Sequence, residues 1–180
     1  MTNLFVYGTL RHVPLLEIVL GRTAVHIDMV VCELPGHAAM AALEGPFPLI
    51  AVSQGHSQTG LILNDLSELD LERLNFYEGG FDYTLSRETA LNGQAVDVYF
   101  PPKLGVTPNG LWDLHAWESK WAAMTVIAAR EVMSFFGERS AADIVRMFPM
   151  IRSRAAANLN ALSSKHGRTT LKGDVEVVSK

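Results

Sequence analysis

Short apolar runs separated by turns dominate the first hundred residues of the chain. The run from Leu4 to Tyr7 is apolar, aromatic and β-branched and stops at Gly8, which predicts a buried strand that ends in a turn. Comparable strand-like runs follow at residues 25–32, 49–52, 60–63, 83–91 and 95–100. Asn92-Gly93 joins the last two runs and is the clearest hairpin signal in the chain.

Two helices are predicted among these strands. A first helix is predicted over residues 14–20, because Pro14 suits a first helical turn and Gly21 follows the last one. A second helix begins after Ser67, which has Asp70 at capping-box distance, and ends near residues 77–78. Many short strands with few helices between them predict an α+β fold built on a small mixed β-barrel with flanking helices.

The composition changes after Pro101-Pro102. Residues 103–110 are interpreted as a linker, residues 115–136 as a long amphipathic helix, and residues 140–149 and 151–162 as two further helices separated at Pro149. We therefore predict a barrel over residues 1–102, a C-terminal helical extension packed on it over 103–164, and a flexible segment over 165–180. Within that segment, residues 174–178 are interpreted as a truncated first strand of a following domain.

Charge and apolar content exclude several classes of partner. The 180 residues carry a formal net charge of −4, which creates no field that would attract nucleic acid or anionic lipid. Residues 139–180 carry 8 Lys and Arg against 3 Asp and Glu, and we interpret this basic end as a solvated helical face. No apolar window reaches the roughly 20 residues that span a bilayer. With one cysteine and no leader-like N-terminus, we expect a cytoplasmic protein without membrane or nucleic-acid partners.

Metal and nucleotide sites lack the residues that they need. The six histidines are not closely paired along the chain, and the single cysteine, Cys32, cannot build a structural zinc site. A glycine loop of the phosphate-binding type is missing as well. We therefore expect no metal and no cofactor.

The first segment with candidate chemistry is Tyr7-Gly8-Thr9-Leu10. Its glycine lets another group approach the backbone closely, and successive N–H groups together with the Thr9 hydroxyl can form a nest for a carboxylate or carbonyl oxygen. An ordinary strand end is the alternative interpretation.

The second segment places Glu78 between aromatic residues, at the end of the predicted second helix and before Gly79-Gly80. Such surroundings desolvate a carboxyl group and raise its pKa into the range useful for proton transfer near neutral pH. A surface glutamate at a helix end is the alternative interpretation.

In this order the two segments resemble the γ-glutamylcyclotransferase family, including its AIG2-like branch. The resemblance rests on residues 5–10 and on residues 74–78 with the Gly79 and Tyr83 that follow, and it extends over roughly residues 3–100. It implies that Tyr7, Gly8, Thr9 and Leu10 bind the γ-glutamyl group of a substrate and that Glu78 accepts and donates the proton. Tyr99 lies on a strand that resembles the family's closing strand. It is a further candidate for the site, with a packed strand tyrosine as the alternative.

The resemblance also implies a reaction. The α-amine of a γ-glutamyl substrate, such as a γ-glutamyl dipeptide or glutathione, attacks its own γ-carbonyl and yields 5-oxoproline and a free amine or amino acid. The protein supplies positioning, a proton carrier and hydrogen-bond donors rather than a nucleophile.

The helical remainder departs from the small cyclotransferases and carries a second resemblance. Residues 10–82, 99–101 and 117–136 look like the N-terminal domain of bacterial proteins that continue into a Nudix ADP-ribose pyrophosphatase, some of them associated with tellurite resistance. This chain has no Nudix box of its own, since only Arg130-Glu131 comes near that pattern. The alternative to an enzyme is therefore a non-catalytic ligand-binding or docking domain of a larger Nudix hydrolase.

Overall fold

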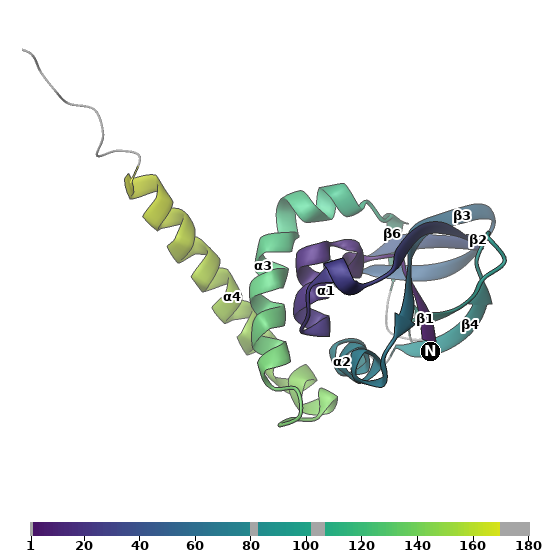
Figure 1. The fold of residues 1–180 in the computed structure, drawn as a ribbon. Coiled ribbons are helices and arrows are strands. Elements are labelled where there is room, and N and C mark those ends of the chain that lie inside the picture. The colour runs from purple at the N-terminus through teal and green to yellow at the C-terminus, as the bar shows by residue number, and fades with distance from the viewer. Residues whose placement is uncertain (1, 80–82, 102–106, 170–180) are drawn as a thin grey trace, which may run out of the picture.

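The structure is a computed structural model that describes residues 2–79, 83–101 and 107–169. A curved sheet forms one side of this described part, and helices cover the other (Figure 1). In chain order the elements are β1 (Thr2–Val6), η1 (Thr9–Arg11), α1 (Val13–Leu20), η2 (Ala24–His26), β2 (Met29–Ala42), β3 (Pro48–Leu66), α2 (Glu68–Glu78), β4 (Thr84–Thr89), β5 (Ala95–Phe100), β6 (Pro108–Leu111), α3 (Leu114–Ser134) and α4 (Ala141–Thr169).

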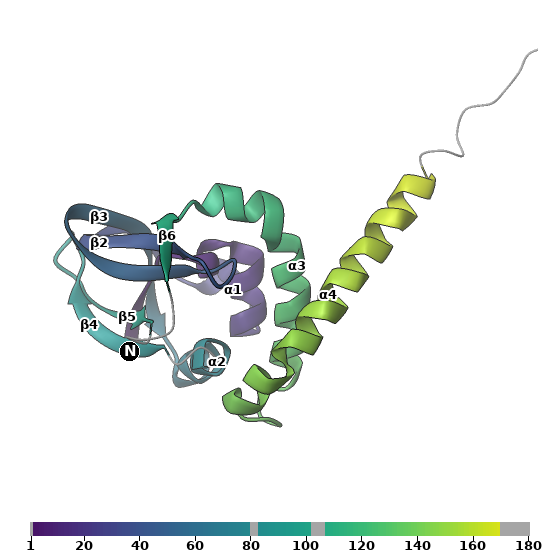
Figure 2. The ribbon, with the colours of Figure 1, turned by 180° about the vertical axis from the view of Figure 1, so that it is seen from behind.

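The described strands form one sheet in the order β4-β5-β1-β3-β2-β6. Strand β1 lies inside this sheet, antiparallel to β3 and parallel to β5. The long β2 and β3 strands pair antiparallel, and their curvature closes the sheet into a half-barrel, as Figure 2 shows from behind. The predicted α+β fold with a small mixed barrel, flanking helices and a C-terminal helical extension is confirmed.

Local signals located the first two helices and the hairpin correctly. Helix α1 follows a Pro-containing first turn and ends at Gly21, whose φ is +69°. The capping box of Ser67 with Asp70 starts α2. Asn92-Gly93 connects β4 and β5, with Gly93 at a φ of +82° that favours glycine.

Strands β2 and β3 are longer than the strand-like runs in the sequence predicted. The separate runs at residues 49–52 and 60–63 belong to a single strand, β3, which continues through the polar residues between them. The predicted run at 25–32 begins in the short η2 turn, and β2 starts only at Met29. Backbone pairing with a long partner, from Met29 opposite Leu63 to Ala41 opposite Pro48, maintains these strands where side-chain alternation is lost.

Two predictions for the C-terminal part are wrong. The end of the expected linker is strand β6, which pairs with β2 at the edge of the sheet. Helix α4 continues through Pro149 instead of ending there. Apolar residues on both sides of that proline, Ile144, Ile151 and Ala155, are buried against α3, and this packing offsets the lost backbone hydrogen bond. Residues 174–178 lie outside the described residues.

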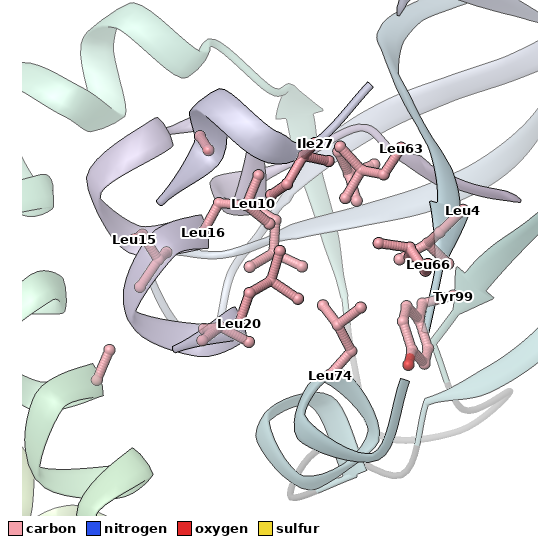
Figure 3. Packing of buried hydrophobic residues seen from close by; sticks show 14 of the residues in the cluster. Leu4, Leu10, Leu15, Leu16, Leu20, Ile27, Leu63, Leu66, Leu74 and Tyr99 are labelled. Carbon is pink, nitrogen blue, oxygen red and sulfur yellow. The ribbon is translucent and has the colours of Figure 1, made fainter. Parts of the chain in front are cut away.

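The main core lies between the sheet and α1. Leucines 15, 16 and 20 of α1 are almost completely buried against Leu4 and Leu63 of the sheet. Figure 3 shows Leu74 of α2 and Tyr99 of β5 at the lower edge of this cluster. Helix α3 packs on the outer side of α1, and α4 packs on α3 (Figure 1). Within the described ranges no helix is long and apolar enough to cross a membrane.

A buried ionic network holds the start of α2. Asp70 is only 3% exposed and accepts two hydrogen bonds of 2.9 Å from the Arg22 guanidinium and one of 2.7 Å from the Ser67 hydroxyl. Burial alone would raise the pKa of Asp70, but the bonds from Arg22 and Ser67 together lower it. The network fixes the helix whose other end carries Glu78.

We expect Asp70→Ala to lower the free energy of unfolding by about 2 kcal/mol, because it removes a cap and leaves Arg22 without its partner. Urea unfolding followed by circular dichroism measures this. Asp143→Ala is the matched control, since Asp143 forms the same capping box with Ser140 at the exposed start of α4. Equal losses in the two variants would contradict a special contribution from the buried network.

Candidate active site

A cavity of about 310 Å³ lies where the end of β1 meets α2, β5 and the outer helices. The six site residues predicted from the sequence all line it, namely Tyr7, Gly8, Thr9, Leu10, Glu78 and Tyr99. The structure therefore brings the N-terminal turn and the distant glutamate to one cavity. Whether these residues bind and convert a substrate stays a prediction.

The turn after β1 is held in place by its neighbours. The Tyr7 hydroxyl donates a 2.9 Å hydrogen bond to the backbone oxygen of Tyr99, which ties the turn to β5. Backbone bonds from Arg11 to Gly8 and from His12 to Thr9, both 3.0 Å, close η1. These contacts present the turn to the cavity in one conformation.

Gly8 is required by a close approach rather than by its φ of −119°. A Cβ atom at this position would lie 2.2 Å from Cγ of Pro48, the first residue of β3. The proline ring cannot swing aside, so any side chain at position 8 would push the turn away from the sheet.

Glu78 is the last residue of α2, and its half-buried side chain faces the cavity. Burial raises the pKa of its carboxyl group to about 7. Near neutral pH the group is therefore divided between its acid and its base form, which suits a residue that takes up a proton and returns it.

All four tyrosines of the chain line the same cavity, at positions 7, 77, 83 and 99. Burial raises the pKa of each, and the nearby Glu78 charge raises it further. Each phenol therefore stays protonated and can donate a hydrogen bond. Three of them do so within the protein, Tyr7 to the Tyr99 backbone, Tyr83 to the Pro48 oxygen at 3.1 Å and Tyr99 to Oδ1 of Asn75 at 2.6 Å.

Sequence reasoning missed Tyr77 and Tyr83 as site residues. They flank Glu78 in the aromatic segment that identified the glutamate, so that segment already contained the signal. The sequence does predict Tyr99 as a site candidate, and its hydroxyl donates to Asn75 of α2. The bond joins β5 to the helix that carries Glu78, which assigns Tyr99 a positioning contribution.

The sequence also did not identify the part of the wall contributed by α3 and α4. This part consists of Met124, Thr125, Ala128, Ala129, Val132, Phe148 and Arg152. The loop between β2 and β3 adds residues 44–47, and Trp117 of α3 holds it by donating from Nε1 to the Pro46 oxygen at 2.9 Å. Helical spacing predicted a buried face on α3, but not that part of this face borders a cavity.

Among the described residues, no group of three or more His, Cys, Asp or Glu side chains is placed to hold a metal ion. The acidic groups that line the cavity are Glu78 and Glu44. Both oxygens of Glu44 lie within 3.0 Å of the backbone N–H of Thr107, which donates to them. Glu44 is therefore engaged by the backbone, whereas no hydrogen bond within the described residues engages the Glu78 carboxyl group.

A sequence model described as γ-glutamyl cyclotransferase, AIG2-like, matches residues 4–118, which is more than half of the chain. The chain belongs to this family. The match includes Tyr7 to Leu10, Glu78 and Tyr99, and it ends shortly after the start of α3. Most of α3 and all of α4 therefore lie outside the part of the chain that matches the AIG2-like cyclotransferases.

Solved structures are similar to this AIG2-like chain, and two of them with TM-scores above 0.5 share its fold. Two Arabidopsis thaliana proteins with solution structures are each 23% identical, with TM-scores of 0.53 and 0.51. The alignments cover 77% and 76% of this chain, and 94% and 84% of theirs. An AIG2-like protein from Mus musculus is 20% identical over 63% of this chain and 88% of its own, with a TM-score of 0.48. A comparison with curated protein sequences finds no significant match.

We expect the free energy of unfolding to fall by about 2 kcal/mol as the pH rises from about 4.5 to about 7. The folded state holds the Glu78 proton more tightly than the unfolded chain does, so this stability is complete at low pH and is lost as the pH passes through the folded-state pKa. Urea unfolding from pH 4.5 to 8 measures the change.

The amide in Glu78→Gln cannot ionise, so the free energy of unfolding of this variant should not fall between pH 4.5 and pH 7. At pH 8 the variant should therefore be more stable than the wild type. Glu72→Gln, on the exposed face of the same helix, is the control and should keep the wild-type profile. An unaltered pH profile in Glu78→Gln would show that Glu78 titrates like an exposed glutamate.

Gly8→Ala should lower the free energy of unfolding by about 1–3 kcal/mol, because the new methyl group overlaps the Pro48 ring. Gly79→Ala is the matched control, since its Cβ would lie 3.6 Å from Cβ of Ala141, which is ordinary contact. Thermal unfolding compares the two variants, and equal melting temperatures would contradict the close approach.

Proposed function

We propose that this protein is a γ-glutamylcyclotransferase that releases 5-oxoproline and a free amine or amino acid from a small γ-glutamyl substrate. The observation that carries the proposal is the shared cavity, in which a glutamate with a pKa near 7 faces the same space as the Tyr7 to Leu10 turn. Membership of the AIG2-like cyclotransferase family supports the same reaction.

The proposed chemistry is a ring closure within the substrate. The neutral α-amine attacks the γ-carbonyl carbon, a C–N bond forms, and the carbonyl oxygen becomes negative. Ionised Glu78 accepts the proton that the attacking nitrogen must lose. It then donates that proton to the leaving nitrogen as the old C–N bond breaks, so the reaction consumes no water and leaves the enzyme unchanged.

The rest of the cavity serves positioning. Cyclisation requires the amine and the carbonyl to be held in a folded arrangement, and the rigid turn with its restricted Gly8 provides a fixed surface for the γ-glutamyl group. Tyr7, Tyr83 and Tyr99 donate their hydroxyl protons within the protein, so among the described tyrosines Tyr77 is the one we propose as a donor to the substrate. Its raised pKa keeps that hydroxyl protonated.

The test is to incubate the protein with γ-glutamyl dipeptides, γ-glutamyl-lysine and glutathione and to measure 5-oxoproline by mass spectrometry. Glu78→Gln should lower the rate by about 10²- to 10⁴-fold, the usual contribution of general acid–base catalysis. In the wild type, kcat/KM should rise with pH through a midpoint near 7, because the base form starts the reaction.

Glu72→Gln again serves as the control and should retain wild-type activity. If no substrate gave 5-oxoproline, the proposed cyclotransferase activity would be rejected. That result would favour the alternative, a ligand-binding or docking domain of a longer Nudix hydrolase, which stays a prediction. Product formed equally by Glu78→Gln would keep the reaction but reject Glu78 as its proton carrier.

A further inference from the structure

Helices α3 and α4 add a wall of mixed character to the cavity. Met124, Ala128 and Val132 follow one another at four-residue intervals on α3, so they form a single apolar stripe along it. Phe148 and Arg152 are one turn apart on α4 and border the same cavity. This wall therefore offers apolar surface and a guanidinium group.

Among the described residues that line the cavity, Arg152 is the one cation. Its guanidinium lies 6.0 Å from the centre of the Trp121 ring, and no hydrogen bond or ion pair engages it in the described part of the chain. Its neighbours on α4 differ, because Arg146 pairs with Asp143 and Arg154 pairs with Glu131 of α3. Arg152 is thus charged, exposed and placed on an aromatic ring, an arrangement that leaves its five N–H donors for a ligand.

Helix α4 is packed against α3 on both sides of residue 152. Ile144, Ile151 and Ala155 are buried against Val132 and Met133 of α3, and the Arg154–Glu131 ion pair joins the two helices. Figure 2 shows α4 lying along α3 over this stretch. The orientation of residue 152 therefore follows from packing on both sides of it.

The two carboxylates among the described lining residues do not neutralise Arg152. Glu44 is occupied by the Thr107 backbone, and Glu78 carries the proton in the proposed reaction. The exposed guanidinium of Arg152 is therefore available to pair with a negatively charged group on a bound molecule. A guanidinium can hold a carboxylate through two parallel hydrogen bonds, which gives it directional preference for that group.

We propose that Arg152 binds the carboxylate of the leaving part of the substrate, so that the preferred leaving group is an α-amino acid with an apolar side chain. This inference rests on the proposed cyclotransferase function. The family match covers the turn and Glu78 but ends before α4. Because Arg152 lines the same cavity as the turn and Glu78, we assign to it the part of the substrate that those residues do not hold. Met124, Val132 and Phe148 form the surface for the apolar side chain.

Two substrates that differ in a single group test this assignment. One is γ-glutamyl-phenylalanine, and the other is γ-glutamyl-phenethylamine, which has the same ring but lacks the carboxylate. For Arg152→Gln we expect kcat/KM on the first substrate to fall by about 10- to 100-fold, mainly through KM, since a lost charged hydrogen bond has this size. Activity on the second should change by less than about twofold.

The matched variants separate charge from structure. Arg146→Gln removes one positive charge from the exposed part of α4 and should leave both substrates unaffected. Arg152→Lys keeps the charge but not the paired donors, so it should restore part of the lost activity on γ-glutamyl-phenylalanine alone. Circular dichroism and melting temperatures of each variant verify that α4 remains folded.

An equal loss on both substrates would overturn the inference, because Arg152 would then act on the γ-glutamyl part or on the fold, and the proposed function would stand. No loss on either would overturn it as well. If the wild type forms no 5-oxoproline at all, the proposed function fails, and calorimetric binding decides the inference separately. Glu78→Gln should then bind γ-glutamyl-phenylalanine at least about tenfold more tightly than the Glu78→Gln, Arg152→Gln double variant, and equal or absent binding would overturn it.

Discussion

The contact between Gly8 and Pro48 is the constraint on which the site depends. Strand β1 has neighbours on both sides, and its residues from Leu4 to Val6 are buried, so the chain has to leave the sheet abruptly at its end. It does so against the first residue of β3, at a distance that leaves no room for a Cβ atom. Because the turn is pressed against the sheet in this way, its residues face the cavity instead of solvent.

Glu78 shows how the fold alters the chemistry of an ordinary side chain. Burial in the cavity wall raises its pKa, because desolvation disfavours the ionised form. The tyrosines around it supply bulk that excludes water, together with hydroxyl groups that connect the surrounding elements. Tyr7 joins the turn to β5, and Tyr99 joins β5 to α2. Hydrogen bonds thereby link the turn, through β5, to the helix that carries the glutamate.

The cavity is built from two parts of the chain, one that matches the family model and one that lies beyond the match. Residues 4–118 contain the half-barrel, the turn and the glutamate, and these are the parts that the proposed reaction uses. Helix α4 and most of α3 lie beyond this match and provide an apolar surface with Arg152. In the proposed reaction, this division would separate the groups that handle the proton from those that contact the rest of the substrate.

The sequence by itself determined the features that depend on neighbours along the chain. The apolar run before Gly8, the capping box of Ser67 with Asp70 and the hairpin turn at Asn92-Gly93 all arise from short-range backbone preferences, and each is present as predicted. The aromatic residues beside Glu78 likewise indicate a desolvated carboxyl group, because they are its immediate neighbours in the chain.

Tertiary structure alone decided which buried surfaces meet. Periodicity identified α3 as having an apolar face, and it ended the next helix at Pro149, but packing against α3 carries α4 through that proline and brings Arg152 to the cavity. Such contacts join residues far apart in the chain, and no local pattern of side chains encodes them.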